Sequence, residues 1–175
     1  MMHDDHPHDG PCGCSSGRLA CPRCGALGNG VARSTVERFI APEALATLGF
    51  GEIRFCANPQ CAVAYYAPLG TAVFKDQLSV RLGLKESQAP RPICHCFGHS
   101  IESLEAEWKA KGSVSAIIDV MGKVRAGECR CGELNPQGTC CLGELRQVVL
   151  ALQNLPSAPE PEPEDDDCGG CSGCG

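Results

Sequence analysis

The chain has 175 residues, including 15 cysteines but only five Phe, two Tyr and one Trp. This length suits one ordinary domain or two small ones, and we expect a thin apolar core that bound metal supplements. The net charge is −6, yet both ends carry only acidic charge, so the middle of the chain has a small basic excess. That excess is too weak for a nucleic-acid-binding surface, and no stretch is long and apolar enough to insert into a membrane.

The first segment, 1–17, is rich in His, Asp, Gly and Cys without periodicity, which predicts a disordered tail. It lacks the basic and apolar regions of a secretory signal peptide, so we expect a cytoplasmic protein. Cytoplasmic thiols stay reduced, and spaced reduced thiols are metal ligands or catalysts far more often than disulfides. We therefore interpret the clustered cysteines as metal ligands.

The next segment, 18–88, predicts a small β-rich domain. Short β-prone runs bounded by Gly or Pro indicate strands at 52–56, 63–66 and 71–74. A short helix is expected at 42–48, with Pro42 in its first turn. Residues 87–92 have the Pro-rich composition of a linker.

The segment 89–155 predicts a helical domain, because apolar residues recur at helical spacing in three core-facing stripes. The stripes are Ile101, Leu104 and Trp108; Val114, Ile117, Ile118, Met121 and Val124; and Leu142, Leu145, Val148, Val149 and Leu152. Ser100 and Ser113 are expected to cap the first two helices. The acidic, Pro- and Cys-rich segment 156–175 predicts a second disordered tail. The fold class is thus α+β, with a small β-rich domain followed by a small helical domain.

Two cysteine pairs in the β-rich segment have the spacing of a structural metal site. Cys21 and Cys24 form a Cys-x-x-Cys knuckle followed by glycine, and Cys56 and Cys61 supply a second pair. Four thiolates without a nearby histidine suit a closed tetrahedral zinc site. Iron in a rubredoxin-like site is the competing interpretation, since the same ligands accept it.

The helical segment holds six further cysteines. Cys94 and Cys96 are separated by one residue, so in extended chain both thiols point the same way and can bind one iron. The other two ligands of a [2Fe–2S] cluster must come from Cys129, Cys131, Cys140 and Cys141. Four basic residues nearby in sequence could offset the negative charge of such a cluster: Arg91, Lys123, Arg125 and Arg130.

These motifs resemble a known family. Cys94-His-Cys96-Phe97 and Asn135-Pro-Gln-Gly-Thr-Cys-Cys-Leu-Gly143 are similar to the bacterioferritin-associated-ferredoxin-like [2Fe–2S] domain. With Cys21-Pro-Arg-Cys24-Gly25 and Cys56-x4-Cys61 before them, residues 18 to 150 resemble the N-terminal part of the CopZ-type copper chaperone family. The resemblance implies one zinc, one [2Fe–2S] cluster and delivery of Cu(I) to a copper-transporting ATPase by a further domain. The chain contains no Met-x-Cys-x-x-Cys copper loop.

Six cysteines are available for four cluster positions. We choose Cys94, Cys96, Cys131 and Cys141, because Cys141 opens the third helix and Cys131 precedes the loop that leads to it. Cys129 and Cys140 are the reserve pair. A Rieske-like arrangement with His95 and His99 is the alternative, but surplus cysteines make it unnecessary.

Both tails carry exposed soft ligands. Cys168, Cys171 and Cys174 form one potential group of metal ligands, and Cys12 and Cys14 form another beside His3, His6 and His8. Thiolates select Cu(I) or zinc.

The sequence therefore predicts an iron–sulfur and zinc protein of copper handling, in which the cluster supplies electrons that keep copper as Cu(I). The alternatives are an electron-transfer module for a reductase or iron-storage partner, and a metal buffer. No catalytic triad, phosphate loop or carboxylate pair can be assembled from these residues, so nothing in the sequence indicates an enzyme.

Overall fold

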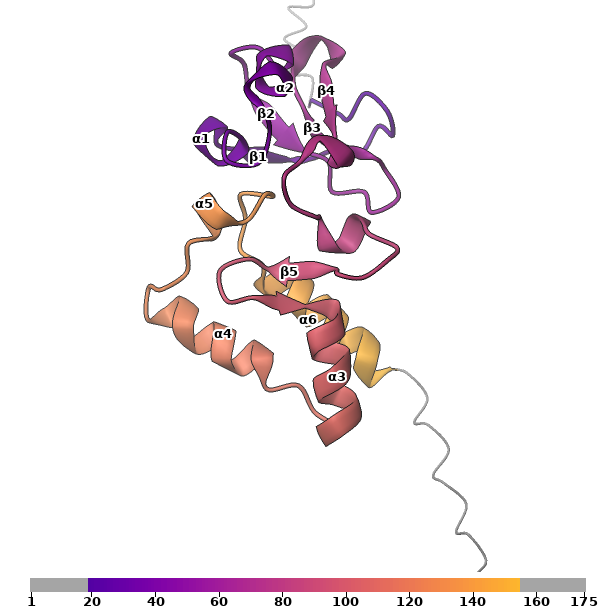
Figure 1. Ribbon diagram of the computed structural model, residues 1–175, viewed down its shortest axis with the longest axis vertical. Helices are drawn as coiled ribbons and strands as arrows, with labels where there is room; N and C mark the ends of the chain where they lie inside the picture. The colour runs from indigo at the N-terminus through magenta and orange to yellow at the C-terminus, as the bar shows by residue number, and fades with distance from the viewer. Residues whose placement is uncertain (1–18, 155–175) are drawn as a thin grey trace, which may run out of the picture.

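The computed structural model describes residues 19–154 and has two lobes joined end to end (Figure 1). The upper lobe in that view contains a four-stranded sheet, and the lower lobe contains a short hairpin and the longer helices. The mixed helix and sheet composition agrees with the expected α+β class. No helix in the described part of the chain is long and apolar enough to cross a membrane.

The sheet is antiparallel, with the strands in chain order. Its members are β1 (Asn29–Val31), β2 (Ile53–Phe55), β3 (Val63–Tyr66) and β4 (Ala72–Phe74). The last three confirm the expected strands, and α2 (Pro42–Thr47) confirms the expected helix, with Pro42 in its first turn. Strand β1 and the four-residue α1 (Arg33–Val36) carry too little periodicity to be predicted.

Strand β3 is the centre of the upper lobe, because all four of its residues are buried. Tyr65 packs edge-on against Phe55, with ring centroids 6.0 Å apart, in the larger apolar core of the upper lobe. Tyr66 belongs to a second, smaller core that contains three cysteines. Successive strand residues point to opposite faces of a sheet, so the Tyr65-Tyr66 pair supplies both cores.

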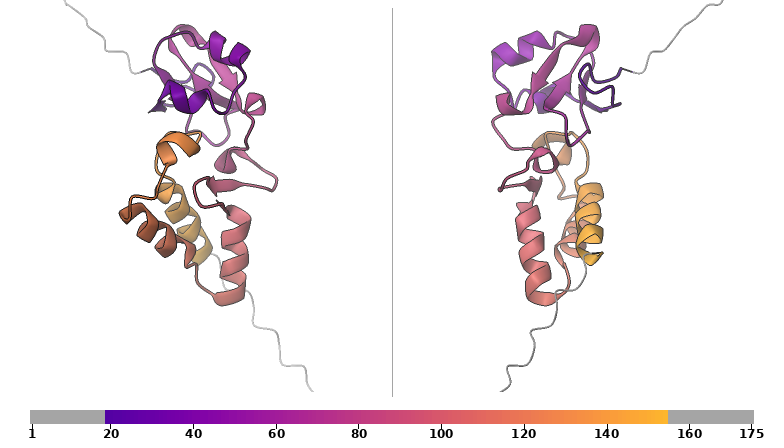
Figure 2. Two further views of the ribbon diagram at one scale, coloured as in Figure 1. Left: turned by 60° about the vertical axis from the view of Figure 1, so that its left-hand side comes forward. Right: turned by 90° about the vertical axis from the view of Figure 1, so that its right-hand side faces the viewer.

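The lower lobe packs three helices around one apolar core. They are α3 (Ile101–Lys111), α4 (Ala116–Arg125) and α6 (Leu142–Gln153), preceded by the hairpin of β5 (Pro92–Cys94) and β6 (His99–Ser100). Figure 2 shows α6 beside α3, with α4 on its other flank. Ser100 caps α3 as expected: its hydroxyl accepts a hydrogen bond from the Ser103 amide at 3.2 Å.

The second cap was predicted wrongly. Helix α4 begins after Ser115, not Ser113, and its N-terminus is satisfied by the Glu107 carboxylate of α3. That carboxylate accepts hydrogen bonds from the Ser115 amide at 3.1 Å and the Ala116 amide at 3.4 Å. A cap supplied by another helix leaves no local sequence signal, which explains the error.

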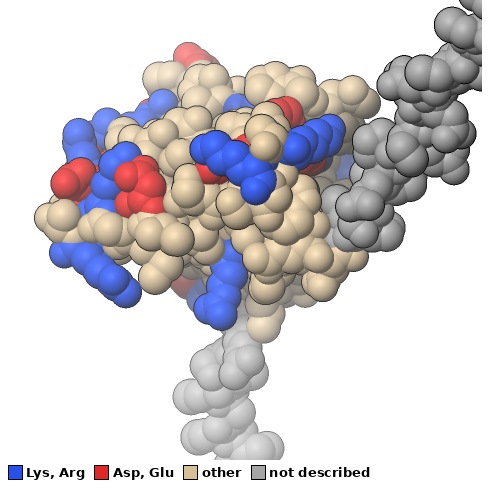
Figure 3. Space-filling model, turned by 90° about the horizontal axis from the view of Figure 1, so that it is seen from below, with Lys and Arg blue, Asp and Glu red and all other residues tan. Residues whose placement is uncertain are grey.

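The second stripe was also assigned too broadly. Val114, Ala116 and Val120 are buried, whereas Ile118 is 72% exposed and Met121 is 38% exposed. The face of the lower lobe seen from below interleaves basic and acidic side chains (Figure 3).

Candidate metal centres

Four thiols converge at the edge of the sheet. The Sγ atoms of Cys21, Cys24, Cys56 and Cys61 all lie within 4.8 Å of one another. Cys21 and Cys61 are 3.9 Å apart, and Cys24 and Cys56 are 3.6 Å apart. A tetrahedron with metal–sulfur bonds of about 2.3 Å has sulfur–sulfur edges of about 3.8 Å. The spacing of the four thiols therefore suits a tetrahedral zinc ion.

Local backbone geometry brings each thiol to this point. The Cys21–Cys24 knuckle is closed by hydrogen bonds from the Gly25 amide to the Cys21 carbonyl and from the Cys21 amide to the Ala26 carbonyl, both at 2.9 Å. Gly25 has φ +71°, a conformation that glycine adopts without strain. Cys56 directly follows β2, and its amide bonds to β3. The sheet thus fixes Cys56, the turn fixes Cys21 and Cys24, and a hydrogen bond from the Cys61 amide to the Asn58 carbonyl at 3.1 Å holds Cys61.

The thiols differ in how readily they lose a proton. A hydrogen bond with the Ala26 backbone lowers the pKa of Cys24 to about 6, and this thiol is exposed. Burial raises the pKa of Cys56 to about 12 and also raises that of Cys61. A cation that stabilises thiolates offsets this burial, which is what bound zinc supplies.

A lysine that the sequence analysis missed stands beside these thiols. Lys85, at the end of the short 3-10 helix η3 (Gly83–Lys85), is only 7% exposed. Its ammonium donates to the carbonyls of Asn58 at 2.6 Å and Cys61 at 3.0 Å, and lies 5.5 Å from the Phe55 ring centroid. Burial lowers the pKa of Lys85, while the four nearby thiolates raise it. A buried cation in this position reduces the net negative charge of a metal bound by four thiolates.

Lys85→Met is expected to weaken zinc retention about 10- to 100-fold, the usual effect of removing a group that supports metal ligands. The measurement is zinc release to a chromogenic chelator under anaerobic conditions. Lys75→Met is the matched control, because the Lys75 ammonium bonds to the Lys85 carbonyl at 2.7 Å and to Glu86, but to no cysteine. Equal zinc release from both variants would show that Lys85 only holds the segment between β2 and β3 in place.

A second group of thiols lies at the top of the lower lobe. The Sγ atoms of Cys96 and Cys131 are 3.6 Å apart, and Cys129 lies within 4.8 Å of both. Cys141 is close enough to Cys94 and to Cys131 to interact electrostatically with both thiols.

Within this group, burial differs from one cysteine to the next. Cys94, Cys131 and Cys141 are buried, Cys96 and Cys129 are half-buried, and Cys140 is exposed. Burial thus sets Cys140 apart from the other five, whereas Cys129 and the proposed ligand Cys96 are both half-buried.

Cys94 and Cys96 each have a neighbour from the later segment: Cys96 lies 3.6 Å from Cys131, and Cys94 lies beside Cys141. Cys96 lies in the turn between β5 and β6, so the two-residue alternation of extended chain does not reach it. Cys131 opens the four-residue α5 (Cys131–Leu134), and Cys141 directly precedes α6 as expected.

The thiols of the second group also differ in pKa. A hydrogen bond from Cys141 lowers the pKa of Cys94 to about 6, and burial raises the pKa of Cys131. The soft, partly ionised donor set suits iron or an iron–sulfur cluster.

Three of the four expected counter-charges pair with carboxylates. Arg91 pairs with Glu102 at 2.7 Å and Glu105 at 2.9 Å, and Arg130 pairs with Glu133. Lys123 pairs with Asp119 at 2.7 Å, but it also lies 4.9 Å from the Phe97 ring centroid, and its charge favours the Cys94 thiolate. Neither thiol group in the described part of the chain includes His95 or His99.

The tail ligands lie outside the described residues. They are Cys12, Cys14, Cys168, Cys171 and Cys174, together with the three N-terminal histidines. Their assignment to copper or another soft metal stays a prediction.

Comparison with known proteins bears on the first thiol group. Residues 18–79 match a family model described as a zinc binding domain of the CopZ type. These residues form a CopZ-type zinc-binding domain. The chain is also similar to a copper chaperone CopZ of Archaeoglobus fulgidus, with 30% identity over 131 residues. That alignment covers 74% of this chain and 61% of the relative, so the chain spans about three-fifths of the relative's length.

A solved structure extends the likeness past the CopZ-type domain. The X-ray structure of the Archaeoglobus fulgidus CopZ N-terminal domain superposes with a TM-score of 0.64 and 27% identity. The match covers 74% of this chain and 97% of that one. An alignment of 131 residues cannot fit within the first 79, so the similarity continues into the lower lobe.

Proposed function

We propose that this protein is a cytoplasmic copper-handling metalloprotein with two resident metal centres. Zinc held by Cys21, Cys24, Cys56 and Cys61 stabilises the upper lobe. A [2Fe–2S] cluster is held by Cys94, Cys96, Cys131 and Cys141, with Cys129 and Cys140 in reserve. The observation that carries the proposal is a second thiol group within a lobe to which the copper-chaperone similarity extends.

The two centres have different tasks. Zinc has no redox chemistry, so the first centre is structural. When bound, a [2Fe–2S] cluster supplies one electron at a time, the amount needed to reduce one Cu(II) to Cu(I). The chain contributes thiolates that prefer Cu(I), and Cys168, Cys171, Cys174, Cys12 and Cys14 are the proposed copper ligands. A redox partner restores the electron, and a copper-transporting ATPase is the proposed acceptor of Cu(I).

The test begins with anaerobic purification, metal analysis and EPR of the reduced protein. One zinc and two irons per chain with a [2Fe–2S] signal are expected, and iron-free protein would end the proposal. The reduced protein is then mixed with Cu(II), and Cu(I) is counted with a colorimetric chelator. One Cu(I) per cluster is expected.

The copper role of the C-terminal tail is tested separately. Deleting residues 168–175 should lower the number of Cu(I) ions retained by the chain. An unchanged number would remove this tail from the copper pathway. Reversible cluster reduction with no copper retained by the full chain would instead favour the electron-transfer module.

A further inference from the structure

The loop that carries two of the proposed cluster ligands is held from inside the CopZ-type domain. Between Cys131 and Cys141 the chain leaves the lower lobe, touches the sheet lobe and returns (Figure 1). Tyr65, fully buried in β3, donates a hydrogen bond to the Pro136 carbonyl at 2.7 Å. Thr35, 1% exposed, donates to the Gly132 carbonyl. Both contacts join residues far apart in the sequence.

Internal hydrogen bonds hold the shape of the loop around Pro136. Asn135 is 1% exposed, and its amide donates to the Thr139 carbonyl at 2.7 Å while its side-chain oxygen accepts from the Gln137 amide at 3.1 Å. Gly138 has φ +65°, and a Cβ there would lie 3.1 Å from Val31. Because the loop holds its own shape, fixing Pro136 and Gly132 also fixes the cysteines at its two ends.

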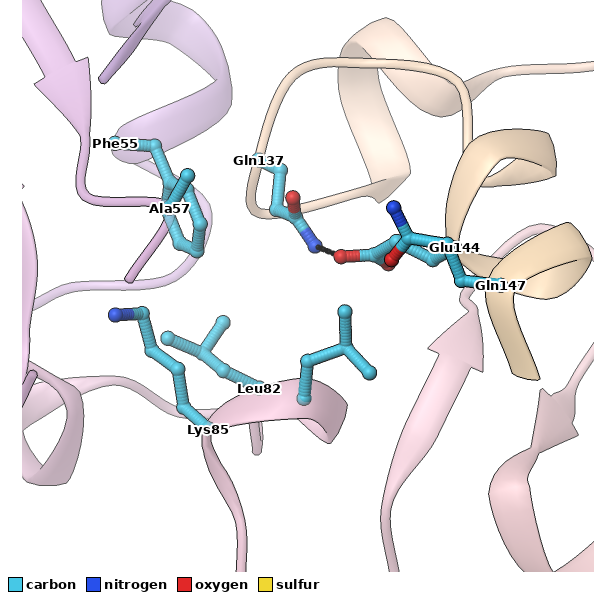
Figure 4. A pocket seen from close by; sticks show the side chains of 8 residues that line it. Phe55, Ala57, Leu82, Lys85, Gln137, Glu144 and Gln147 are labelled. Carbon is cyan, nitrogen blue, oxygen red and sulfur yellow. Dashed lines mark hydrogen bonds between the residues drawn. The ribbon is translucent and has the colours of Figure 1, made fainter. Parts of the chain in front are cut away.

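The hydrogen bonds from Tyr65 and Thr35 determine the position of the loop, because the space around it is incompletely packed. A cavity of about 180 Å³ lies between the lobes, so apolar packing does not fill the whole interface. Figure 4 shows Gln137 and Glu144 on one side of this cavity, with Phe55 and Lys85 opposite. Gln137 donates to Glu144, and burial raises the pKa of that carboxyl. The loop is therefore located by specific polar contacts rather than by close packing alone.

Tyr66, the next residue in β3, anchors the segment that carries two of the zinc ligands. Tyr66 points to the other face of β3, and its hydroxyl donates to the carbonyls of Leu19 at 3.2 Å and Ala26 at 3.4 Å. Those residues flank the Cys21–Cys24 knuckle. Tyr66 also packs with Cys21 and Cys56 in the small cysteine-containing core. Adjacent hydroxyls on one strand thus anchor the segments that bear the two thiol groups.

We propose that Tyr65 is a positioning residue for the iron–sulfur site, and that β3 thereby makes the zinc-binding domain the support of the cluster loop. This inference rests on the proposed function, because it needs a cluster in the second thiol group. Tyr65 touches no proposed ligand itself. It acts on Cys131 and Cys141 through Pro136 and the hydrogen-bonded loop.

The experiment compares Tyr65→Phe with Tyr66→Phe in the full chain carrying both metals. Each variant removes one buried hydroxyl and leaves the ring in place. Iron release to a ferrous chelator and zinc release to a chromogenic chelator are followed anaerobically. Tyr65→Phe is expected to speed iron release about threefold to tenfold, the effect of one lost buried hydrogen bond, with zinc release unchanged. Tyr66→Phe should speed zinc release and leave iron release unchanged while zinc is bound.

A second pair of variants separates positioning from general destabilisation. Thr35→Val keeps the shape of the side chain but loses the bond to Gly132, so it should also speed iron release. Thr35→Ser keeps the hydroxyl and should restore the parent rate. The EPR line shape of the reduced cluster is expected to change in Tyr65→Phe and not in Tyr66→Phe.

The outcomes are distinguishable from failure of the proposed function. Parent protein without iron would overturn the function and this inference with it. Parent protein with a normal cluster, and Tyr65→Phe with the parent's iron-release rate, would overturn the inference alone. Equal acceleration of iron release by Tyr65→Phe and Tyr66→Phe would show that Tyr65 stabilises the core generally and does not position the cluster loop.

Discussion

Cys56→Ser is expected to abolish zinc binding and unfold the upper lobe. Cys56 is fully buried at the junction of β2 and β3, and its thiol is one of four that fit a tetrahedral ion. Structural zinc sites contribute about 10–16 kcal/mol in small zinc-finger peptides, whereas whole domains are stable by about 5–15 kcal/mol. Losing most of the metal's contribution therefore exceeds what the small sheet can tolerate.

The measurements for Cys56→Ser are zinc content and thermal unfolding followed by circular dichroism. Cys140→Ser is the matched control, because Cys140 is an exposed cysteine outside the zinc group. The control should keep one zinc and the parent's unfolding temperature. A Cys56→Ser protein with one zinc and parental stability would remove this cysteine from the ligand set.

Cys131→Ser and Cys141→Ser are each expected to abolish the visible absorption of the cluster. Both thiols are buried: Cys131 lies 3.6 Å from Cys96, and Cys141 lies beside Cys94. A serine in either place replaces a soft ligand with a weakly acidic hydroxyl, which iron in a cluster binds poorly. The proposed ligand set of four then keeps three thiolates, too few to close the cluster.

Cys129→Ser and Cys140→Ser are the controls for this ligand set. Both are less buried than Cys131 and Cys141, so each variant should keep the cluster spectrum and two irons per chain. The reverse pattern, with intact absorption in Cys131→Ser and Cys141→Ser but none in Cys129→Ser or Cys140→Ser, would replace the ligand set with the reserve pair.

Spacing in the sequence predicted those features that depend on neighbouring residues. Cys21 and Cys24 are a local knuckle, and the strands at 53–55 and 63–66 follow from alternating β-prone residues. Cys141 was correctly placed at the start of α6 for the same reason. Local structure of this kind follows from patterns of residue type among neighbours in the sequence.

Features that depend on tertiary contacts could not be predicted. In the sequence Lys85 looks like a solvent-exposed surface lysine, whereas in the folded protein it is buried beside Cys61. The carboxylate of Glu107 reaches α4 only because two helices meet. Tyr65 and Thr35 bond to carbonyls 71 and 97 residues away in the chain. No window of sequence contains both partners of such a contact.

The Tyr65 contact has a consequence for the order in which the protein is made. Domains generally fold N-terminal first as the chain leaves the ribosome. The zinc ligands are complete at Cys61, and Tyr65 follows within the same strand, long before Cys131 and Cys141 are synthesised. The folded upper lobe therefore already holds the Tyr65 hydroxyl in place when the loop with Pro136 is synthesised, and the loop can bind to it. We expect zinc to load during translation and iron afterwards, so zinc starvation should appear in cells as a shortage of cluster-loaded protein.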